Sequence, residues 1–249
     1  MPKPPRTREE IDAIRKQILD QAIDIISQYG FAGFTMRRLG TRMGFAAKTI
    51  YNYFTSKDEI YLLVLTRGFE LLNERYAQAF ATTDHPKKRL MEMNRAYVTF
   101  GLEYPHYYNI MFNWDVPKYL DYVGTPMEPA AGNEKKEGLK LAMINLKALK
   151  AYLKYAGTPE ITFNELRLKM IKGWSALHGI VSLNNSRVLQ ETLDPETTDF
   201  FEGSLFKDSR FKESKEDKTH SAKIPGDQTF DEVLASSITS VLEDVFKFF

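Results

Sequence analysis

Cysteine is absent from the 249-residue chain, which excludes disulfides, thiol nucleophiles and cysteine-ligated metal sites. Only four histidines occur, and they show no paired metal-ligand spacing, so we expect no metal. No uncharged apolar run approaches the roughly 20 residues that a membrane-spanning helix needs. The N-terminus also lacks the apolar region of a secretory signal. We therefore expect a cytoplasmic protein without a membrane partner.

Signals of enzyme chemistry are missing as well. We find no Gly-rich phosphate loop, no nucleophile elbow and no metal-ligand cluster. The Asp and Glu residues are scattered over predicted helix faces, where solvation explains them. The sequence therefore predicts no enzymatic activity and no cofactor.

The net charge of +1 hides an asymmetry along the chain. Residues 1–57 contain ten Lys and Arg and five Asp and Glu, a net charge of +5. The remaining residues therefore carry a net charge of −4. A basic head on an acidic body is typical of a protein that meets a polyanion at one end, although many solvated surfaces share such a bias.

Helix signals recur along the whole chain, and alternating strand patterns are absent. Thr7 and Ser56 each open a capping box, and Gly30 and Gly44 are placed to end helices. These signals predict an all-α fold of about nine helices. The principal predicted segments are a helix from Thr7 to Gly30, two short helices between 35 and 54, helices at 57–80, 133–155, 162–188 and 229–249, and a loop at 113–132.

Residues 34–54 carry the most informative pattern. Two helices of under ten residues meet at Gly44, and each is too short to be stable alone. They must bury their apolar side chains against the first helix, which predicts a three-helix DNA-binding module. The second short helix can enter a major groove, which is about 12 Å wide. An apolar three-helix packing unit with a solvated basic face is the alternative interpretation.

The predicted exposed face of this module offers groups suited to DNA. Lys48 and Thr49 can reach bases or phosphates, and Ala47 can contact a thymine methyl group. Hydroxyl groups, Lys57 and the helix N-terminus at Thr35 suit phosphate oxygens. The candidate DNA contacts are Thr35, Arg38, Ala47, Lys48, Thr49, Tyr51, Tyr53 and Lys57.

This segment resembles the N-terminal domain of the tetracycline-repressor (TetR) family. The family's Thr, turn Gly, Thr-Leu-Tyr-x-x-Phe and Lys correspond to Thr35, Gly44, residues 49–54 and Lys57. The resemblance covers about residues 10–65 and implies DNA-contact roles for positions 47, 48, 49, 51, 53 and 57. Ala46 departs from the Ser or Thr that often starts the family's recognition helix, and loss of such a cap costs about 1 kcal/mol.

Residues 173–183 resemble the Trp-x-x-x-His-Gly type of TetR C-terminal domain. We therefore expect a helix-turn-helix domain at 1–60 and a helical-bundle domain for ligand binding and dimerisation at 61–249, with a flexible linker at 203–227. Trp174 and His178 share a helix face and either pack in the core or face a ligand. The candidate ligand-binding residues are Phe100, Tyr104, Tyr108, Met111, Phe112, Trp114, Trp174 and His178.

The resemblance also implies partners. Helices 162–188 and 229–249 would form a homodimer interface, with the terminal phenylalanines buried there or within the monomer. The dimer would bind double-stranded DNA at a pseudo-palindromic operator as a repressor, and a small, largely apolar effector would release it. The alternatives are a helical interaction protein or a constitutive DNA binder without ligand control.

Overall fold

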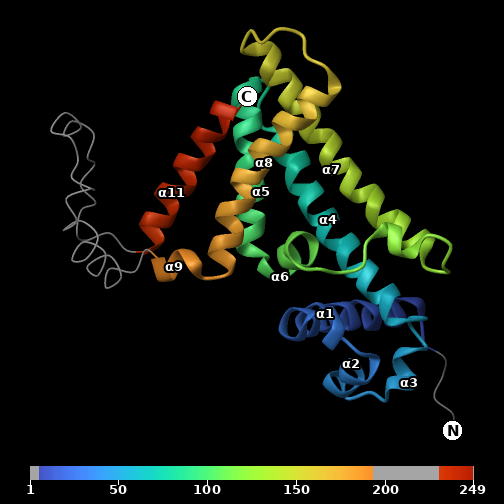
Figure 1. Ribbon diagram of the computed structural model, residues 1–249. Coiled ribbons are helices and arrows are strands. Elements are labelled where there is room, and N and C mark those ends of the chain that lie inside the picture. The colour runs from blue at the N-terminus through green and yellow to red at the C-terminus, as the bar shows by residue number, and fades with distance from the viewer. Residues whose placement is uncertain (1–5, 193–229, 249) are drawn as a thin grey trace. The chain divides into compact units, whose positions relative to one another are not determined.

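The computed structural model describes residues 6–192 and 230–248 of the chain (Figure 1). Every regular element within these two ranges is a helix, which confirms the predicted all-α class. Residue contacts divide the chain into two compact units, 1–170 and 171–249. In the described ranges, no helix combines the length and apolarity needed to cross a membrane. The predicted linker at 203–227 and the capping residue Thr229 lie outside the described residues.

Three helices form the N-terminal head: α1 (Arg8–Gly33), α2 (Met36–Met43) and α3 (Ala47–Ile50). The predicted capping box is present, because the Thr7 hydroxyl accepts from the Glu10 N–H and the Glu10 carboxylate accepts from the Thr7 N–H. Gly30 has a φ of 69°, but the helix resumes for one further turn to Gly33. Apolar side chains from the three helices, including Ile18, Leu39 and Ile50, are fully buried together.

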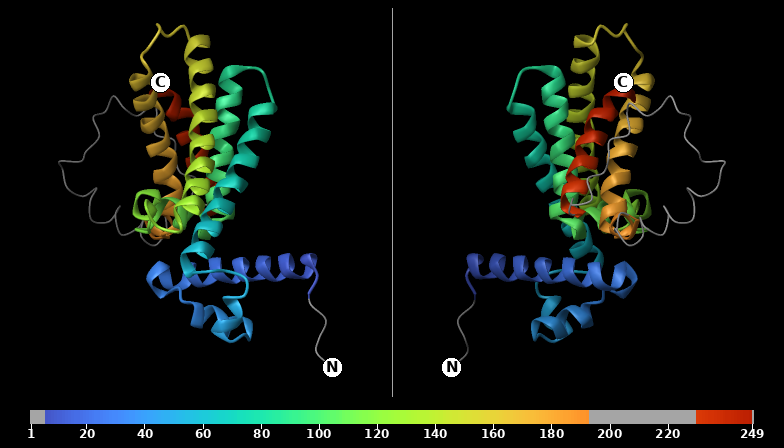
Figure 2. Two further views of the ribbon diagram at one scale, coloured as in Figure 1. Left: turned by 90° about the vertical axis from the view of Figure 1, so that its right-hand side faces the viewer. Right: turned by 90° about the vertical axis from the view of Figure 1, so that its left-hand side faces the viewer.

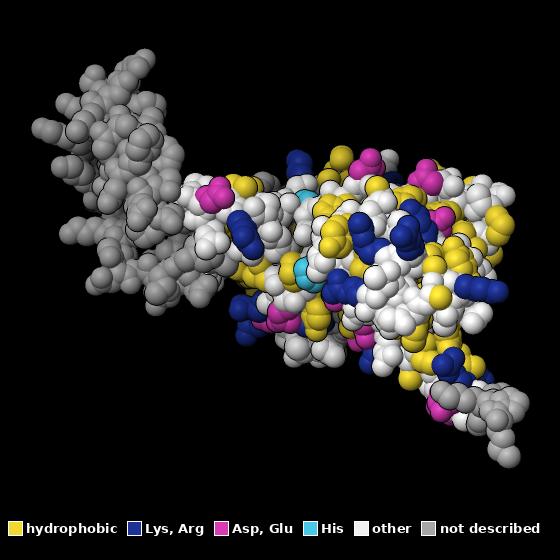
Figure 3. Space-filling model, turned by 90° about the horizontal axis from the view of Figure 1, so that it is seen from below, with side chains coloured by type: hydrophobic (Ala, Val, Ile, Leu, Met, Phe, Trp, Pro, Cys, Tyr) yellow, Lys and Arg dark blue, Asp and Glu magenta, His cyan; other side chains and the backbone are white. Residues whose placement is uncertain are grey.

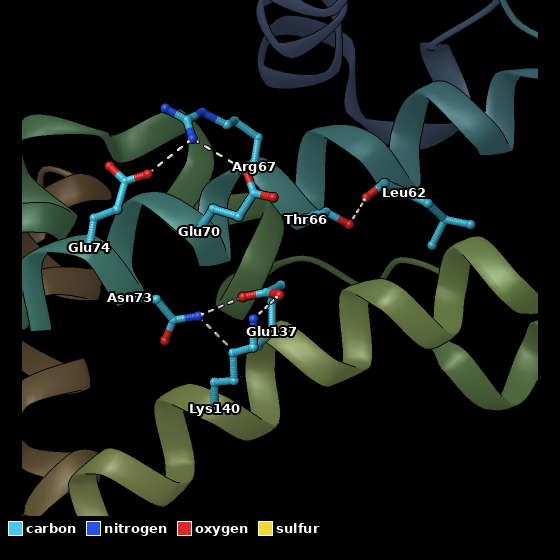
Figure 4. A network of polar contacts seen from close by, with 8 residues as sticks. All are labelled: Leu62, Thr66, Arg67, Glu70, Asn73, Glu74, Glu137 and Lys140. Carbon is cyan, nitrogen blue, oxygen red and sulfur yellow. Dashed lines mark hydrogen bonds and ion pairs between the residues drawn. The ribbon is translucent and has the colours of Figure 1, made fainter. Parts of the chain in front are cut away.

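The body of the first unit is built on α4 (Lys57–Ala81), α5 (Pro86–Glu103) and α7 (Glu128–Tyr155), which pack against one another. α1 packs across the N-terminal end of α4, as Figure 2 shows. Figure 4 shows a polar clamp between α4 and α7. The Asn73 amide donates to the Glu137 carbonyl at 3.0 Å and to its carboxylate at 3.2 Å.

Between α5 and α7 lie α6 (Pro105–Tyr108), a π-helical turn η1 (Asn109–Asn113) and a 3₁₀ turn η2 (Tyr119–Tyr122). The prediction that the loop lasts to residue 132 is wrong, because α7 already begins at Glu128. Pro129 lies in the first turn of α7, where a missing N–H costs nothing. α7 ends at Tyr155 as predicted, and Gly157 follows with a φ of 75°.

α8 (Phe163–Asn185) runs from the first unit into the second, which also contains α9 (Val188–Thr192), α11 (Phe230–Asp244) and the 3₁₀ turn η4 (Val245–Phe248). The predicted helix at 162–188 ends three residues early, and Arg187 has a φ of 64° in the turn before α9. Val181, Leu242 and Val245 are buried. The final predicted helix is confirmed from Phe230 to Asp244, after which the chain continues as the 3₁₀ turn η4.

Candidate nucleic-acid interface

α2, which precedes the turn to α3, is capped at both of its ends. The Thr35 hydroxyl accepts from the Arg38 N–H at 3.1 Å, and Gly44 has a φ of 69°. Gly40 permits the close approach of the two helices, because a Cβ there would lie 2.8 Å from the Phe45 carbonyl oxygen and 3.1 Å from the Ala47 nitrogen. Sequence reasoning missed Gly40, although a glycine inside so short a helix is itself a signal of close packing.

A hollow of about 450 Å³, the α2–α4 hollow, gathers four of the predicted DNA contacts. Thr35, Ala47, Tyr51 and Lys57 all line it, together with Arg37. The first turns of α2 and α4 both border this hollow, and helix N-termini favour anions through their free N–H groups. The Lys57 ammonium is held 4.0 Å from the Phe31 ring centroid. The hollow therefore combines hydroxyl groups, cations and helix N-termini, as a phosphate site requires.

A second hollow of about 430 Å³ also borders Thr35, and Arg37, Arg38 and Arg42 line it. Arg38 stacks 4.0 Å from the Tyr29 ring centroid and donates to the Gly33 carbonyl. Arg42 pairs with Asp24 at 3.1 Å, so both of these guanidinium groups have partners within the head.

Arg37 lines both hollows, and its side chain pairs with no acid among the described residues. It is exposed and is therefore available to an external anion. Arg37 is not among the predicted DNA contacts, although its position beside Arg38, in the first turn after Thr35, is a signal that points to it.

In α3, Lys48 is exposed and forms no ion pair within the described parts of the chain, whereas Thr49 is half-buried. Tyr51, directly after α3, is 54% exposed. Figure 3 shows this end of the molecule, where Lys and Arg side chains are spread over the face and acidic side chains lie mostly toward its margin. The predicted helix to Phe54 is shorter in the structure, since turns replace it after Ile50. Ala46 provides no side-chain cap, as its residue type implies.

The prediction that Tyr53 lies on the exposed face is wrong, because its side chain is only 7% exposed. Arg6 donates to the Tyr53 hydroxyl, and Arg15 donates to the Tyr53 carbonyl. Arg15 also stacks 4.2 Å from the Phe54 ring centroid and lies 3.6 Å from the Glu59 carboxylate. These contacts tie α1 to the segment between α3 and α4, because a long planar guanidinium can serve several partners at once.

Six of the predicted ligand-binding residues lie in α5, α6 and the segment that follows. Phe100, Tyr108 and Met111 are buried. Tyr108 shares a 2.8 Å hydrogen bond with the Tyr97 hydroxyl, and its ring centroid lies 5.1 Å from that of Phe112. Burial raises the pKa of Tyr108. The cluster is thus a packed aromatic interior with hydroxyl groups inside it.

The other two aromatic residues of this set are more accessible. Tyr104 is 36% exposed and lies under the guanidinium of Arg75, 5.0 Å from its ring centroid. Trp114 is half-buried. Whether the set lines a ligand site remains a prediction.

Trp174 and His178 belong to the second unit, where their ring centroids are 6.1 Å apart. Trp174 is 42% exposed within the single chain, and its role as a core or ligand-facing residue stays a prediction. His178 is half-buried, and burial lowers the pKa of its imidazole. An accessible indole beside an imidazole whose pKa is lowered by burial suits an apolar partner.

Two family models match the chain. One, described as bacterial regulatory proteins of the tetR family, matches residues 18–64, and the other, described as a tetracyclin repressor-like C-terminal domain, matches residues 90–205. The chain belongs to the TetR family. The first match contains the whole α2–α3 turn and the α2–α4 hollow, so the hollow occupies the DNA-binding module of a TetR-type protein.

Curated TetR-type relatives align over part of their length. The chain is 28% identical over 135 residues to the transcriptional activator FasR of Mycolicibacterium smegmatis, covering 54% of this chain and 59% of FasR. It is 34% identical over 86 residues to the repressor KstR of the same organism, covering 33% of this chain and 42% of KstR. The chain therefore spans about half the length of the curated relatives it matches.

Solved TetR-family structures share the fold over nearly the whole chain. The ketosteroid transcriptional regulator KstR2 of Mycobacterium tuberculosis has a TM-score of 0.58 and 14% identity, covering 92% of this chain and 93% of that one. The TetR family regulator PfmR of Thermus thermophilus has a TM-score of 0.56, also at 14% identity, covering 91% and 97%. At such identities the likeness concerns the fold alone.

Proposed function

We propose that the chain is a transcription regulator that binds double-stranded DNA as a homodimer and represses from a pseudo-palindromic operator. The α2–α4 hollow carries this proposal, because it brings Thr35, Arg37, Tyr51 and Lys57 around two helix N-termini. Phosphate oxygens in that hollow would place α3 against the major groove. Lys48 and Thr49 then contact base edges. Relatives include an activator and repressors, and repression is the direction proposed here.

An exposed apolar stripe supports the dimer. Ile171 and Trp174, three residues apart on α8 in the second unit, are 45% and 42% exposed. Exposed apolar side chains gathered on one element mark an interaction surface. A twofold partner presenting the same stripe would cover it, and two heads would then meet two half-sites about one DNA turn apart, roughly 34 Å.

Effector control forms the second part of the proposal. A small, largely apolar ligand that prefers one dimer geometry would shift the spacing of the two heads and release the operator. The aromatic interior around Tyr97 and Tyr108 supports such a role, because it combines apolar surface with a few polar hydroxyl groups. A constitutive DNA binder without effector control is the alternative, and operator binding that no ligand alters would favour it.

Gel shifts on a panel of operators selected with the purified protein test the DNA site. Tyr51→Ala with Lys57→Ala, and separately Arg37→Gln, should weaken binding to every sequence and reduce the salt dependence, because they remove phosphate contacts. Lys48→Gln should instead change the ranking of operators.

Lys88→Gln is the matched control, since Lys88 is an exposed lysine of α5 outside both hollows. Full binding by the Tyr51→Ala/Lys57→Ala variant would refute the site. Absence of sequence-selective binding by the unaltered protein would instead favour a helical interaction protein.

A further inference from the structure

The C-terminal half of α7 and the first turn of α8 enclose a groove of about 930 Å³, the α7–α8 groove. Its volume lies within the range of roughly 300–1,000 Å³ that is typical of small-molecule sites. The lining includes the buried Leu146, Leu153 and Leu166, and also Met143 and Phe163, which are 61% and 60% exposed. All of these residues belong to the first unit. The groove therefore has a packed apolar floor and an accessible apolar rim.

The wall formed by residues 156–162 is held in place by its own hydrogen bonds. Gly157 has a φ of 75°, and the Thr158 N–H donates to the Leu153 carbonyl at 3.0 Å. At the start of α8, the Glu165 carboxylate accepts from the Thr162 N–H at 2.7 Å and from its hydroxyl at 2.8 Å. A groove with a preformed wall loses little conformational entropy when it takes a ligand.

Three lysines line the groove from one helix, against a single acid. Lys147, Lys150 and Lys154 are spaced three and four residues apart on α7, so they lie on one face, and Glu160 is the acidic residue of the lining. A helix C-terminus attracts cations only within its last turn, and Lys154 is the only one of the three lysines there. The helix end therefore does not account for Lys147 and Lys150. Lys147 reaches toward the Phe80 ring, at 5.2 Å from its centroid. Lys150 has no acidic or aromatic partner among the described residues. Its positive charge is therefore available to a ligand.

We propose that the α7–α8 groove binds an anionic amphiphile, a molecule with an acyl-like tail and a carboxylate or phosphate head. The tail covers Met143, Phe163 and the leucine floor, and the head lies between Lys150 and Lys154. A second copy of the chain fits less well, because a twofold contact through the groove would bring two sets of these lysines together. The inference concerns binding alone and does not depend on the operator proposal.

Isothermal titration calorimetry of the full chain with decanoate, below its micelle concentration at pH 8, tests the site. Decanol is the uncharged comparison. Decanoate should bind more tightly than decanol, and raising NaCl from 0.05 to 0.5 M should weaken only decanoate, because the lysines are solvent-exposed and screened by salt. In Lys150→Gln/Lys154→Gln, decanoate affinity should fall by about tenfold or more, since charged hydrogen bonds are lost. Decanol affinity should change less than about twofold.

Lys88→Gln/Lys136→Gln removes the same charge from two exposed positions outside the groove and should leave decanoate binding unchanged. Equal binding of decanoate and decanol, or equal losses in the two double variants, would overturn the proposal. If the groove instead holds a second copy, decanoate does not bind, and Phe163→Glu lowers the dimer fraction in sedimentation. If a variant folds poorly, equal binding of decanoate and decanol by the unaltered protein, or decanoate binding that salt does not weaken, still overturns the proposal, and circular dichroism monitors folding throughout.

Discussion

The structure predicts most directly how Gly40→Ala changes the stability of the head. The added methyl group would lie 2.8 Å from the Phe45 carbonyl oxygen, 3.1 Å from the Ala47 nitrogen and 3.3 Å from the Ala46 carbonyl carbon. All three contacts are backbone atoms of the turn between α2 and α3. No flexible side-chain end is available to move away, so the turn itself must shift.

Two opposing effects set how much Gly40→Ala changes the free energy of unfolding. Alanine is favoured over glycine inside a helix by about 1 kcal/mol. Overpacking a close-packed site costs about 1–3 kcal/mol, and rigid backbone neighbours place Gly40 at the upper end. We expect a net loss of about 2 kcal/mol in the free energy of unfolding of the head. Gly132→Ala is the matched control, because its Cβ would meet only Tyr119 Cε2, at 4.0 Å, and should gain up to about 1 kcal/mol.

Urea unfolding followed by circular dichroism, at one protein concentration, measures both variants. Hydrogen exchange of the α2 and α3 amides localises the loss to the head. We also expect Gly40→Ala to weaken operator binding, because displacing the turn moves α3 relative to the α2–α4 hollow. A Gly40→Ala protein as stable as the unaltered one, or Gly40→Ala and Gly132→Ala changes of the same sign, would refute the argument.

Two further predictions concern the interior of the first unit. Burial raises the pKa of Glu134, with only partial compensation from Lys118, so the folded state holds this proton more tightly than the unfolded state and loses stability as pH rises above about 4.5. Glu134→Gln should therefore raise the melting temperature at pH 7.5 but not at pH 4, and an equal change at both would contradict this. Tyr97→Phe removes the 2.8 Å hydrogen bond to Tyr108 at a 2% exposed site and should cost about 1 kcal/mol, measured by urea unfolding. Tyr155→Phe, at a 56% exposed ring, should change stability by less than about 0.5 kcal/mol, and equal losses would argue against the buried pair.

Helix ends were predictable where local chemistry decides them. Thr7, Thr35 and Ser56 cap helices as their hydroxyl groups predict, and Gly44 takes the left-handed conformation that ends α2. The predicted loop at 113–132 misses the start of α7, because proline suits the first turn of a helix as well as a loop, and Pro129 lies in such a first turn. Local patterns thus leave a choice that only tertiary packing resolves.

Side-chain exposure at the candidate interface was less predictable. Tyr51 and Tyr53 lie two residues apart in the same motif, yet Tyr51 is 54% exposed and Tyr53 only 7%. The difference comes from Arg6 and Arg15, which reach Tyr53 from more than 35 positions earlier in the chain. No periodicity within residues 47–54 contains that information.

By itself, the sequence determined the all-α class, the head with its short paired helices, and most of the groups now found around the α2–α4 hollow. It could do so because caps, glycine turns and helical periodicity act over a few residues. Only the tertiary structure decided that Gly40 is a contact point, that Arg37 borders both hollows, that Tyr53 is buried, and that the α7 lysines face an apolar groove. The burial of Tyr53 depends on contacts with Arg6 and Arg15, which lie far away in the chain. The other three depend on how neighbouring helices approach one another, which the periodicity within a single helix does not contain.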